Sequence, residues 1–237
     1  MAENNRDFDA TKHFDAQRAS VYDLKIRKIV PGYETMHDLS LNLLHHHFPA
    51  QAHILVAGAG TGQEAISCAQ VNPAWRITGV DPTEKMLSIA RIHVEYANLS
   101  ERVHLHLGEV KDLPIEVHFD AATSILVMQF IPDNGGKKTY LKEIASRLKP
   151  GGKFIVIDLV GDKAAKEFEV LLSTWQARQL RLGDDAAEVR KDFEHILRDI
   201  GFVTENRMGD LLQEAGFKNI SKFFQAYLFC GWIAEKA

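Results

Sequence analysis

The sequence predicts an α/β fold: a doubly wound sheet of seven mostly parallel strands with a C-terminal antiparallel strand, an N-terminal helical lid and a helical insertion. Short apolar strands alternate with helical segments from residue 53 to residue 159. A glycine-rich turn, Gly58-Ala59-Gly60-Thr61-Gly62, directly follows the first of these strands. Two further stretches rich in apolar and aromatic residues, 219–229 and 230–234, close the chain.

Each element of the alternation has its own signal. Short apolar runs typical of buried strands lie at residues 53–57, 76–80, 103–107, 119–124 and 153–159. Helical spacing of apolar residues predicts helices at 33–48, 63–70, 84–97 and 137–148. Pro82 opens the helix that starts at residue 84, and Pro150 follows the end of the last one. This order of elements is typical of a Rossmann-like sheet.

Two regions fall outside the alternation. Apolar residues spaced three and four apart predict helices over 168–182 and 189–200, which we assign to a helical insertion at about residues 162–206. Residues 1–48 precede the first strand and change from polar sequence to helical spacing. We predict that residues 1–48 form the N-terminal helical lid, and that residues 49–237 form the sheet domain with its insertion.

Length and composition favour a single cytoplasmic enzyme domain. The 237 residues can bury a full core, and the net charge of −4 gives no electrostatic reason to expect nucleic acid. No apolar run reaches the ~18 residues that a membrane span needs. Cys68 and Cys230 stand in apolar surroundings, which is typical of buried thiols in a reducing compartment. We expect a small-molecule substrate and no nucleic-acid or membrane partner; a homodimer stays open.

The glycine turn and the acid after the next strand indicate a nucleoside cofactor. Glycines let a ligand approach the backbone closely, because no Cβ is in the way. Asp81 ends the second strand and can accept hydrogen bonds from ribose hydroxyls. A nicotinamide dinucleotide site prefers the pattern GxGxxG, but Gln63 stands where that pattern has its last glycine. An NAD(P)-binding oxidoreductase therefore stays open only as a weaker alternative.

A series of motifs over about residues 20–160 resembles the class I S-adenosylmethionine-dependent methyltransferases. The motifs are, in order, the glycine turn, Asp81, Gly108-Glu109, Phe119-Asp120 and Leu148-Lys149-Pro150-Gly151-Gly152. The resemblance implies S-adenosylmethionine as the cofactor and methyl transfer to a small-molecule acceptor. The cofactor-binding residues that it implies are Ala57, Gly58, Ala59, Gly60, Gly62, Asp81, Pro82, Met86, Glu109, Val110, Ser124 and Ile125.

The N-terminal segment adds further candidates, because it is similar to the lid of the small-molecule members of this family. Such a lid closes over the cofactor and excludes water. We expect Arg27 to pair with the cofactor carboxylate, since a guanidinium can bind a carboxylate through two hydrogen bonds. Tyr22 is a further cofactor-site candidate. Tyr33 and Gln129 are candidates for the substrate site, and many family members carry histidine at the position of Gln129.

One position departs from the family pattern. The family usually has an acidic residue two positions before the first glycine, and this chain has Val56 there. The usual carboxylate near the methionine ammonium is therefore missing, and Thr61 or a residue of the N-terminal segment is the expected substitute. No general base stands out in the sequence, so the catalytic residues stay unknown, and we predict no metal site. Successive helix residues point about 100° apart, so His45-His46-His47 cannot converge on one ion.

A narrower resemblance links the chain to the carboxy-S-adenosylmethionine synthases. It is based on Pro31-Gly32-Tyr33, Met128-Gln129-Phe130 and the tail at 223–229. That group makes a modified cofactor for tRNA wobble uridine chemistry, and Arg190 stands roughly where it keeps a carboxylate-binding arginine. Its glycine turn is of a different kind. We interpret the likeness as shared architecture, and keep synthesis of a carboxylated cofactor as the alternative reaction.

Overall fold

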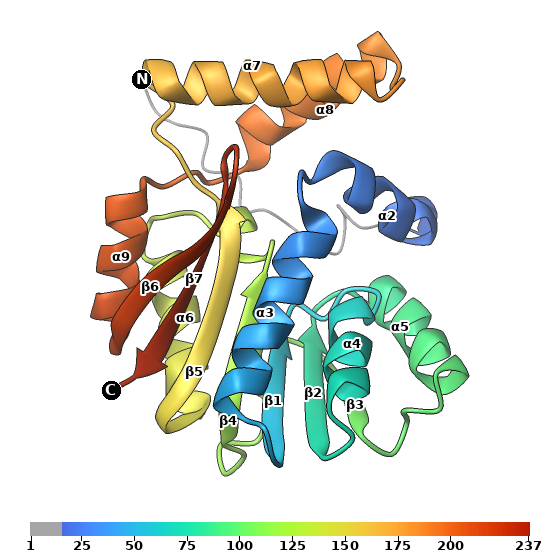
Figure 1. Cartoon of the computed structure of the whole chain (residues 1–237), viewed down its shortest axis with the longest axis vertical. Helices are drawn as coiled ribbons and strands as arrows, with labels where there is room; N and C mark the ends of the chain where they lie inside the picture. The colour runs from blue at the N-terminus through green and yellow to red at the C-terminus, as the bar shows by residue number, and fades with distance from the viewer. Residues whose placement is uncertain (1–15) are drawn as a thin grey trace.

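The computed structural model describes residues 16–237, and it has a seven-stranded sheet at its centre (Figure 1). The strands are β1 (Ala52–Ala57), β2 (Trp75–Asp81), β3 (Val103–Leu107), β4 (Phe119–Ile125), β5 (Leu148–Leu159), β6 (Phe217–Ala226) and β7 (Phe229–Lys236). Their order in the sheet is β3-β2-β1-β4-β5-β7-β6. β7 runs opposite to the other six strands. The predicted fold class, including its C-terminal antiparallel strand, is confirmed.

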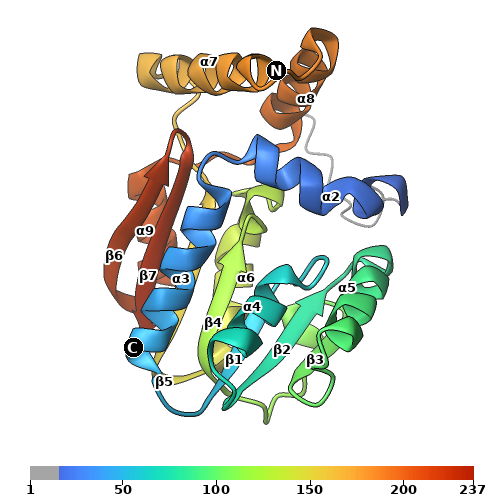
Figure 2. The same cartoon turned by 45° about the vertical axis from the view of Figure 1, so that its right-hand side comes forward.

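The helices form a layer on each face of the sheet and a group beyond one edge. They are α2 (Ala16–Ile29), α3 (Tyr33–His47), α4 (Gln63–Val71), α5 (Glu84–Tyr96), α6 (Gly136–Arg147), α7 (Lys166–Arg181), α8 (Ala186–Asp199) and α9 (Glu205–Glu214). α3, α4 and α5 cover one face, and α6 and α9 cover the other. α2, α7 and α8 lie beyond the carboxyl ends of the parallel strands (Figures 1 and 2).

The central strand β1 is apolar on both faces, which explains its unbroken apolar sequence. Ile54 and Val56 pack in the layer of α3, α4 and α5, whereas Leu55 and Ala57 pack in the layer of α6. All four side chains are buried. Because neighbouring residues of a strand point to opposite faces, β1 holds both layers together and positions the glycine turn that follows it.

Two details of the C-terminal part differ from the sequence expectation. Helix α9 is not among the predicted elements, although Met208, Leu211 and Leu212 are fully buried at helical spacing. This helix has only 10 residues and contains Gly209, so its periodic signal is weak. The hairpin between β6 and β7 turns before Phe229 rather than after it. No glycine, proline or asparagine marks this turn in the sequence.

Helix α7 fastens the end of α2 through polar side chains. The last carbonyl groups of a helix have no partner inside it. The carbonyl of Ile29 accepts hydrogen bonds from Trp175 Nε1 at 2.8 Å and from Gln179 Nε2 at 2.9 Å. Trp175 is 1% exposed and packs edge-on against Phe193 of α8 and Phe229 of β7. The predicted lid and the predicted insertion are therefore in contact.

The domain division at residues 48 and 49 remains a prediction, and residues 1–15 of the predicted lid lie outside the described part of the chain. Within residues 16–237, no helix is long and apolar enough to cross a membrane. Cys68 and Cys230 are free and buried, and burial raises the pKa of both thiols, to about 11 for Cys230. Neither thiol is therefore a ready nucleophile near neutral pH.

We predict that Trp175→Ala lowers the free energy of unfolding by about 3–5 kcal/mol, because it removes a large buried side chain and a hydrogen bond to the end of α2. Urea denaturation followed by circular dichroism measures this loss. Val170→Ala is the matched control on the same helix, since Val170 is 59% exposed. Equal stability of the two variants would contradict the role of Trp175 in joining α2, α7 and α8.

Candidate functional site

A cavity of about 460 Å³ lies at the carboxyl ends of β1, β2 and β4. Ligands of doubly wound sheets bind at this edge, where the strand order reverses, and here the reversal falls between β1 and β4. Many of the predicted cofactor residues line the cavity. They are Tyr22, Ala57, Gly58, Gly60, Asp81, Pro82, Met86, Glu109, Val110 and Ile125.

The first glycine of the turn is required by two constraints. Gly58 has a φ of 84°, a left-handed conformation that other residues rarely adopt. A Cβ at this position would stand 2.2 Å from Cγ2 of Val127. The N–H of Gly58 donates to the carbonyl of Val80 at 2.8 Å, which fixes the turn against the end of β2. Bare backbone is therefore present at the cavity wall.

The other residues of the turn have different roles. Gly60 lines the cavity below Met86, whose Cε would lie 3.5 Å from a Cβ on that glycine. Ala59 is buried and does not line the cavity. Gly62 also lies away from the cavity; it precedes α4, and a Cβ there would meet the Cβ of Ala90 on α5 at 3.0 Å. The last glycine therefore allows two helices to pack closely.

The carboxylate of Asp81 bridges two backbone turns at the edge of the cavity. Its Oδ2 accepts a hydrogen bond from the N–H of Gly60 at 2.9 Å, and its Oδ1 accepts one from the N–H of Thr83 at 2.8 Å. Burial raises the pKa of Asp81, and these two hydrogen bonds oppose the rise. Each carboxylate oxygen has a further lone pair, so Asp81 can still accept hydrogen bonds from a ligand.

Glu109 lies at the next strand end, after β3. Its N–H donates to Asp112 at 2.8 Å, which helps to start the 3-10 helix η1 (Val110–Asp112). Its carboxylate is exposed and pairs with Lys111 at 2.6 Å. Val110 is buried at the cavity wall. The ends of β2 and β3 therefore present an apolar surface flanked by two acids.

One wall of the cavity comes from residues that the sequence patterns did not identify. Gly136, Thr139, Tyr140 and Glu143 of α6 all line it. Their spacing of three and four residues puts them on one helix face, and this was the signal available in the sequence. The hydroxyl of Tyr140 hydrogen-bonds Ser124 at 2.8 Å. Ser124 is fully buried and lies behind this wall rather than in it.

The segment after β4 has an unusual backbone. Leu126 has a φ of 60°, in the left-handed region, although it is not glycine. Its N–H donates to the carbonyl of Ile157 at 2.7 Å, which holds this conformation against β5. Such residues concentrate at functional sites, where the surrounding structure compensates the strain. Leu126 and Val127 both line the cavity, close to Gly58.

Helix α2 covers the glycine turn from outside the sheet (Figure 2). Tyr22 lines the cavity, and burial raises the pKa of its hydroxyl, which therefore stays protonated. Asp23 accepts a hydrogen bond from Thr61 Oγ1 at 2.6 Å. Arg27 does not line the cavity; its Nη2 donates to Oε1 of Gln63 at 2.9 Å. Two side chains of α2 thus hold it on the glycine turn and on the start of α4.

The three predicted substrate residues lie apart from one another. Tyr33 begins α3, and its ring centre lies 5.5 Å from the guanidinium carbon of Arg27. Gln129 is 7% exposed in the 3-10 helix η2 (Met128–Phe130), and its N–H donates to Asp158 at 3.0 Å. Arg190 is exposed on α8. None of the three lines the cavity, and their roles in substrate binding remain predictions.

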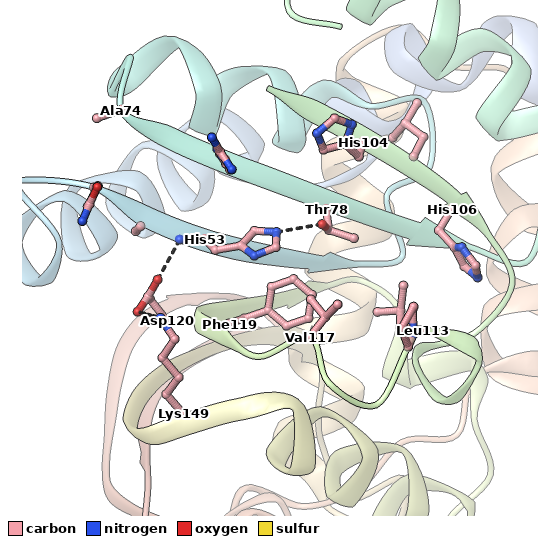
Figure 3. Close-up of a pocket in the computed structure, with 15 residues that line it drawn as sticks. His53, Ala74, Thr78, His104, His106, Leu113, Val117, Phe119, Asp120 and Lys149 are labelled. Atoms are coloured by element: carbon pink, nitrogen blue, oxygen red, sulfur yellow. Dashed lines mark hydrogen bonds and ion pairs between the residues drawn. The ribbon is translucent and has the colours of Figure 1, made fainter. Parts of the chain in front are cut away.

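A second cavity, of about 830 Å³, lies near the amino ends of β1 and β2 (Figure 3). It exists because the connection between β3 and β4 contains η1 and no longer helix to cover this face. His53 hydrogen-bonds Thr78 at 2.9 Å, and His104 and His106 lie on β3. The described residues contain no group of three or more histidine, cysteine or acidic side chains that could hold a metal ion. None of the predicted site residues lines this cavity.

Comparisons with known proteins agree with the site at the carboxyl edge. A family model described as a methyltransferase domain matches residues 54–152. The O-methyltransferase cnsE of Penicillium expansum is 30% identical over 65% of this chain, and the chain spans only about half, 53%, of that protein. The carboxy-S-adenosyl-L-methionine synthase of Colwellia psychrerythraea is 28% identical over 94% of this chain and 91% of its own length.

A solved O-methyltransferase family protein from Burkholderia thailandensis has the same fold, with a TM-score of 0.68 at 11% identity over 95% of this chain and 61% of its own. The matched domain and these likenesses support a class I S-adenosylmethionine-dependent methyltransferase, as the motifs predict, and S-adenosylmethionine as its cofactor.

We predict that Gly58→Ala destabilises the protein more than Gly183→Ala does. The two glycines have nearly the same φ, 84° and 85°, but a Cβ meets Val127 at position 58 and meets nothing within 4 Å at position 183. The shared left-handed backbone should cost about 1–2 kcal/mol in both variants. Urea denaturation measures the free energy of unfolding of both variants, and the difference between them gives the cost of the clash with Val127. Equal losses would contradict the close approach to Val127, and adding Val127→Ala should partly restore the stability of Gly58→Ala.

Proposed function

We propose that the protein transfers the methyl group of S-adenosylmethionine to a small-molecule acceptor, with the cofactor bound in the 460 Å³ cavity. The single observation that carries this proposal is the row of groups along the cavity. The glycine turn, Asp81 and Glu109 follow β1, β2 and β3 in that order. The methionine part would lie along the glycine turn, the ribose at Asp81 and the adenine between Met86 and Val110.

The proposed reaction needs alignment more than it needs acid–base groups. The sulfonium of the cofactor is already activated, and one in-line displacement moves the methyl group. Holding the acceptor in line can supply ~7–11 kcal/mol of the barrier. In this protein, the closed position of α2 and the wall of α6 would exclude water from the cavity. Tyr22 and Tyr140 have a raised pKa through burial, so both would contribute neutral hydroxyls.

The acceptor would enter from the side of α7 and α8. These two helices lie beyond the carboxyl ends of the strands, over the same edge as the cavity (Figure 1). The cavity wall nearest the end of β4 is apolar, with Leu126, Val127, Phe130 and Ile131. We therefore expect an acceptor with an apolar body. We expect no nucleic-acid partner, and the two buried free thiols support our placing the protein in the cytoplasm.

Synthesis of a carboxylated cofactor is a second candidate function. It is favoured by relatives of that activity that align with 94% of this chain, including the lid and the insertion. Incubation of the protein with S-adenosylmethionine and prephenate, followed by mass spectrometry, tests it. A cofactor heavier by one carboxylate would establish this reaction. Absence of that species, together with transfer of an isotope-labelled methyl group to any small molecule of a metabolite extract, would establish methyl transfer.

We predict that Asp81→Asn weakens the binding of S-adenosylhomocysteine, measured by isothermal titration calorimetry. The amide keeps the size of the side chain but loses the charge and one acceptor, so the loss should be about 1.5–3 kcal/mol. Asp210→Asn is the control, because Asp210 is exposed on α9, far along the chain from the cavity residues. An unchanged affinity in a folded Asp81→Asn variant would remove Asp81 from the cofactor site.

A further inference from the structure

The absence of an acid at position 56 leaves the proposed cofactor site without its usual anion. The amino-acid end of S-adenosylmethionine carries both an ammonium and a carboxylate. A charged group that leaves water needs a partner of opposite charge or several hydrogen bonds. Val56 is fully buried at the end of β1 and offers neither. A different side chain must therefore face the ammonium group if this protein binds the cofactor.

Glu64 lies at the right place for this role. It is the second residue of α4, which begins directly after the glycine turn. Thr123 on β4 is the strand partner of Val56, and the same Thr123 hydroxyl lies close enough to the Glu64 carboxyl to influence its ionisation. The Glu64 carboxyl is therefore next to the position where an acid at residue 56 would stand. Glu64 follows Val56 by eight residues in the sequence, but the two positions are close in the fold.

One oxygen of the Glu64 carboxyl group lacks a hydrogen-bond donor. This atom, Oε1, is buried and accepts no hydrogen bond from the described residues. Burial raises the pKa of Glu64 to about 7, against the opposing effect of the Thr123 hydroxyl. A buried carboxylate oxygen without a donor destabilises the folded protein. An ammonium group would supply the missing donor and the missing charge together.

Two other acids, Asp23 of α2 and Glu34 of α3, act on Tyr33 together with Glu64, and each already has a partner: Thr61 for Asp23 and Arg27 for Glu34. Tyr33 of α3, Tyr140 of α6 and Cys68 of α4 have a pKa raised first by burial and further by Glu64, so all three are neutral near pH 7. The neighbouring cation, Arg27 of α2, binds the adjacent Gln63 and forms an ion pair with Glu34. Tyr140, whose ionisation Glu64 influences, lines the cavity, whereas Glu64 itself does not.

We propose that Glu64 binds the ammonium group of S-adenosylmethionine and replaces the acid that the family carries two residues before its first glycine. This inference rests on the proposed function, since it concerns the same cavity. Thr61, the substitute named from the sequence, already donates a hydrogen bond to Asp23 of the N-terminal segment at 2.6 Å. Arg27 does not line the cavity, and its pairing with the cofactor carboxylate remains a prediction.

We predict that the affinity for S-adenosylhomocysteine depends on pH, and the ionisation of Glu64 gives the sign of this dependence. Below pH 7 Glu64 is protonated and neutral, so it attracts the ligand ammonium only weakly. Above pH 7 it is a carboxylate, whereas the ligand ammonium stays charged. The affinity for S-adenosylhomocysteine should therefore rise about tenfold from pH 6 to pH 8. 5′-Methylthioadenosine has the same nucleoside but no amino-acid end, and its affinity should stay constant over this range.

Calorimetric titration of the full chain with both ligands tests the proposal. Glu64→Gln should weaken S-adenosylhomocysteine about tenfold or more at pH 8, abolish the pH dependence and leave 5′-methylthioadenosine unchanged. Glu95→Gln, at an exposed position of α5, is the matched control and should behave as the wild type. Retained binding of 5′-methylthioadenosine also shows that the variant is folded.

Four results would overturn the proposal, and they differ from one another. Equal losses for both ligands would show that Glu64 only supports the fold. No loss for either ligand, or a selective loss in Asp23→Asn instead, would show that another group meets the ammonium. Failure of the wild-type protein to bind either ligand would refute the proposed function itself. A flat pH profile in the wild type would contradict the role of Glu64 without any substitution.

Discussion

The hydrogen bonds of Asp81 are the contacts on which the candidate site depends. One carboxylate holds the N–H of Gly60 and the N–H of Thr83, which belong to turns after two different strands. Parallel strands end at the same edge of a sheet, so one short side chain can join both turns. This contact fixes the backbone of the glycine turn at the cavity and keeps a buried acid beside it. Asp81 therefore both fixes the backbone of the site and supplies a buried negative charge.

The rest of the site is built outward from this edge. The turn can lie close to Val127 because Gly58 has no Cβ, and the strained backbone of Leu126 brings Val127 there. Helix α2 closes the outer side through the bond between Asp23 and Thr61, and α7 in turn holds the end of α2. A chain of contacts thus connects the helical group beyond the sheet to the cavity.

The sheet and the part of the cavity formed by the strand ends could be predicted, because each is encoded in a short stretch of sequence. Apolar strands, the glycine turn and Asp81 are each readable within a few residues, and they lie at one edge as expected. The wall of α6, with Tyr140, was not predicted, because its polar face resembles any solvated helix face. The partners of Gln129 and the exposure of Arg190 depend on contacts between distant segments. Glu64 likewise resembles an ordinary acid of a first helical turn, and only its burial distinguishes it.

The most direct measurement is a crystal structure of the protein with S-adenosylhomocysteine. We predict density in the cavity between β1 and β4, with the ribose hydroxyls on Asp81, the adenine beside Met86 and the ammonium on Glu64. Density for the ligand elsewhere, with this cavity empty, would contradict the account. Such a result would reduce the glycine turn and Asp81 to parts of the fold.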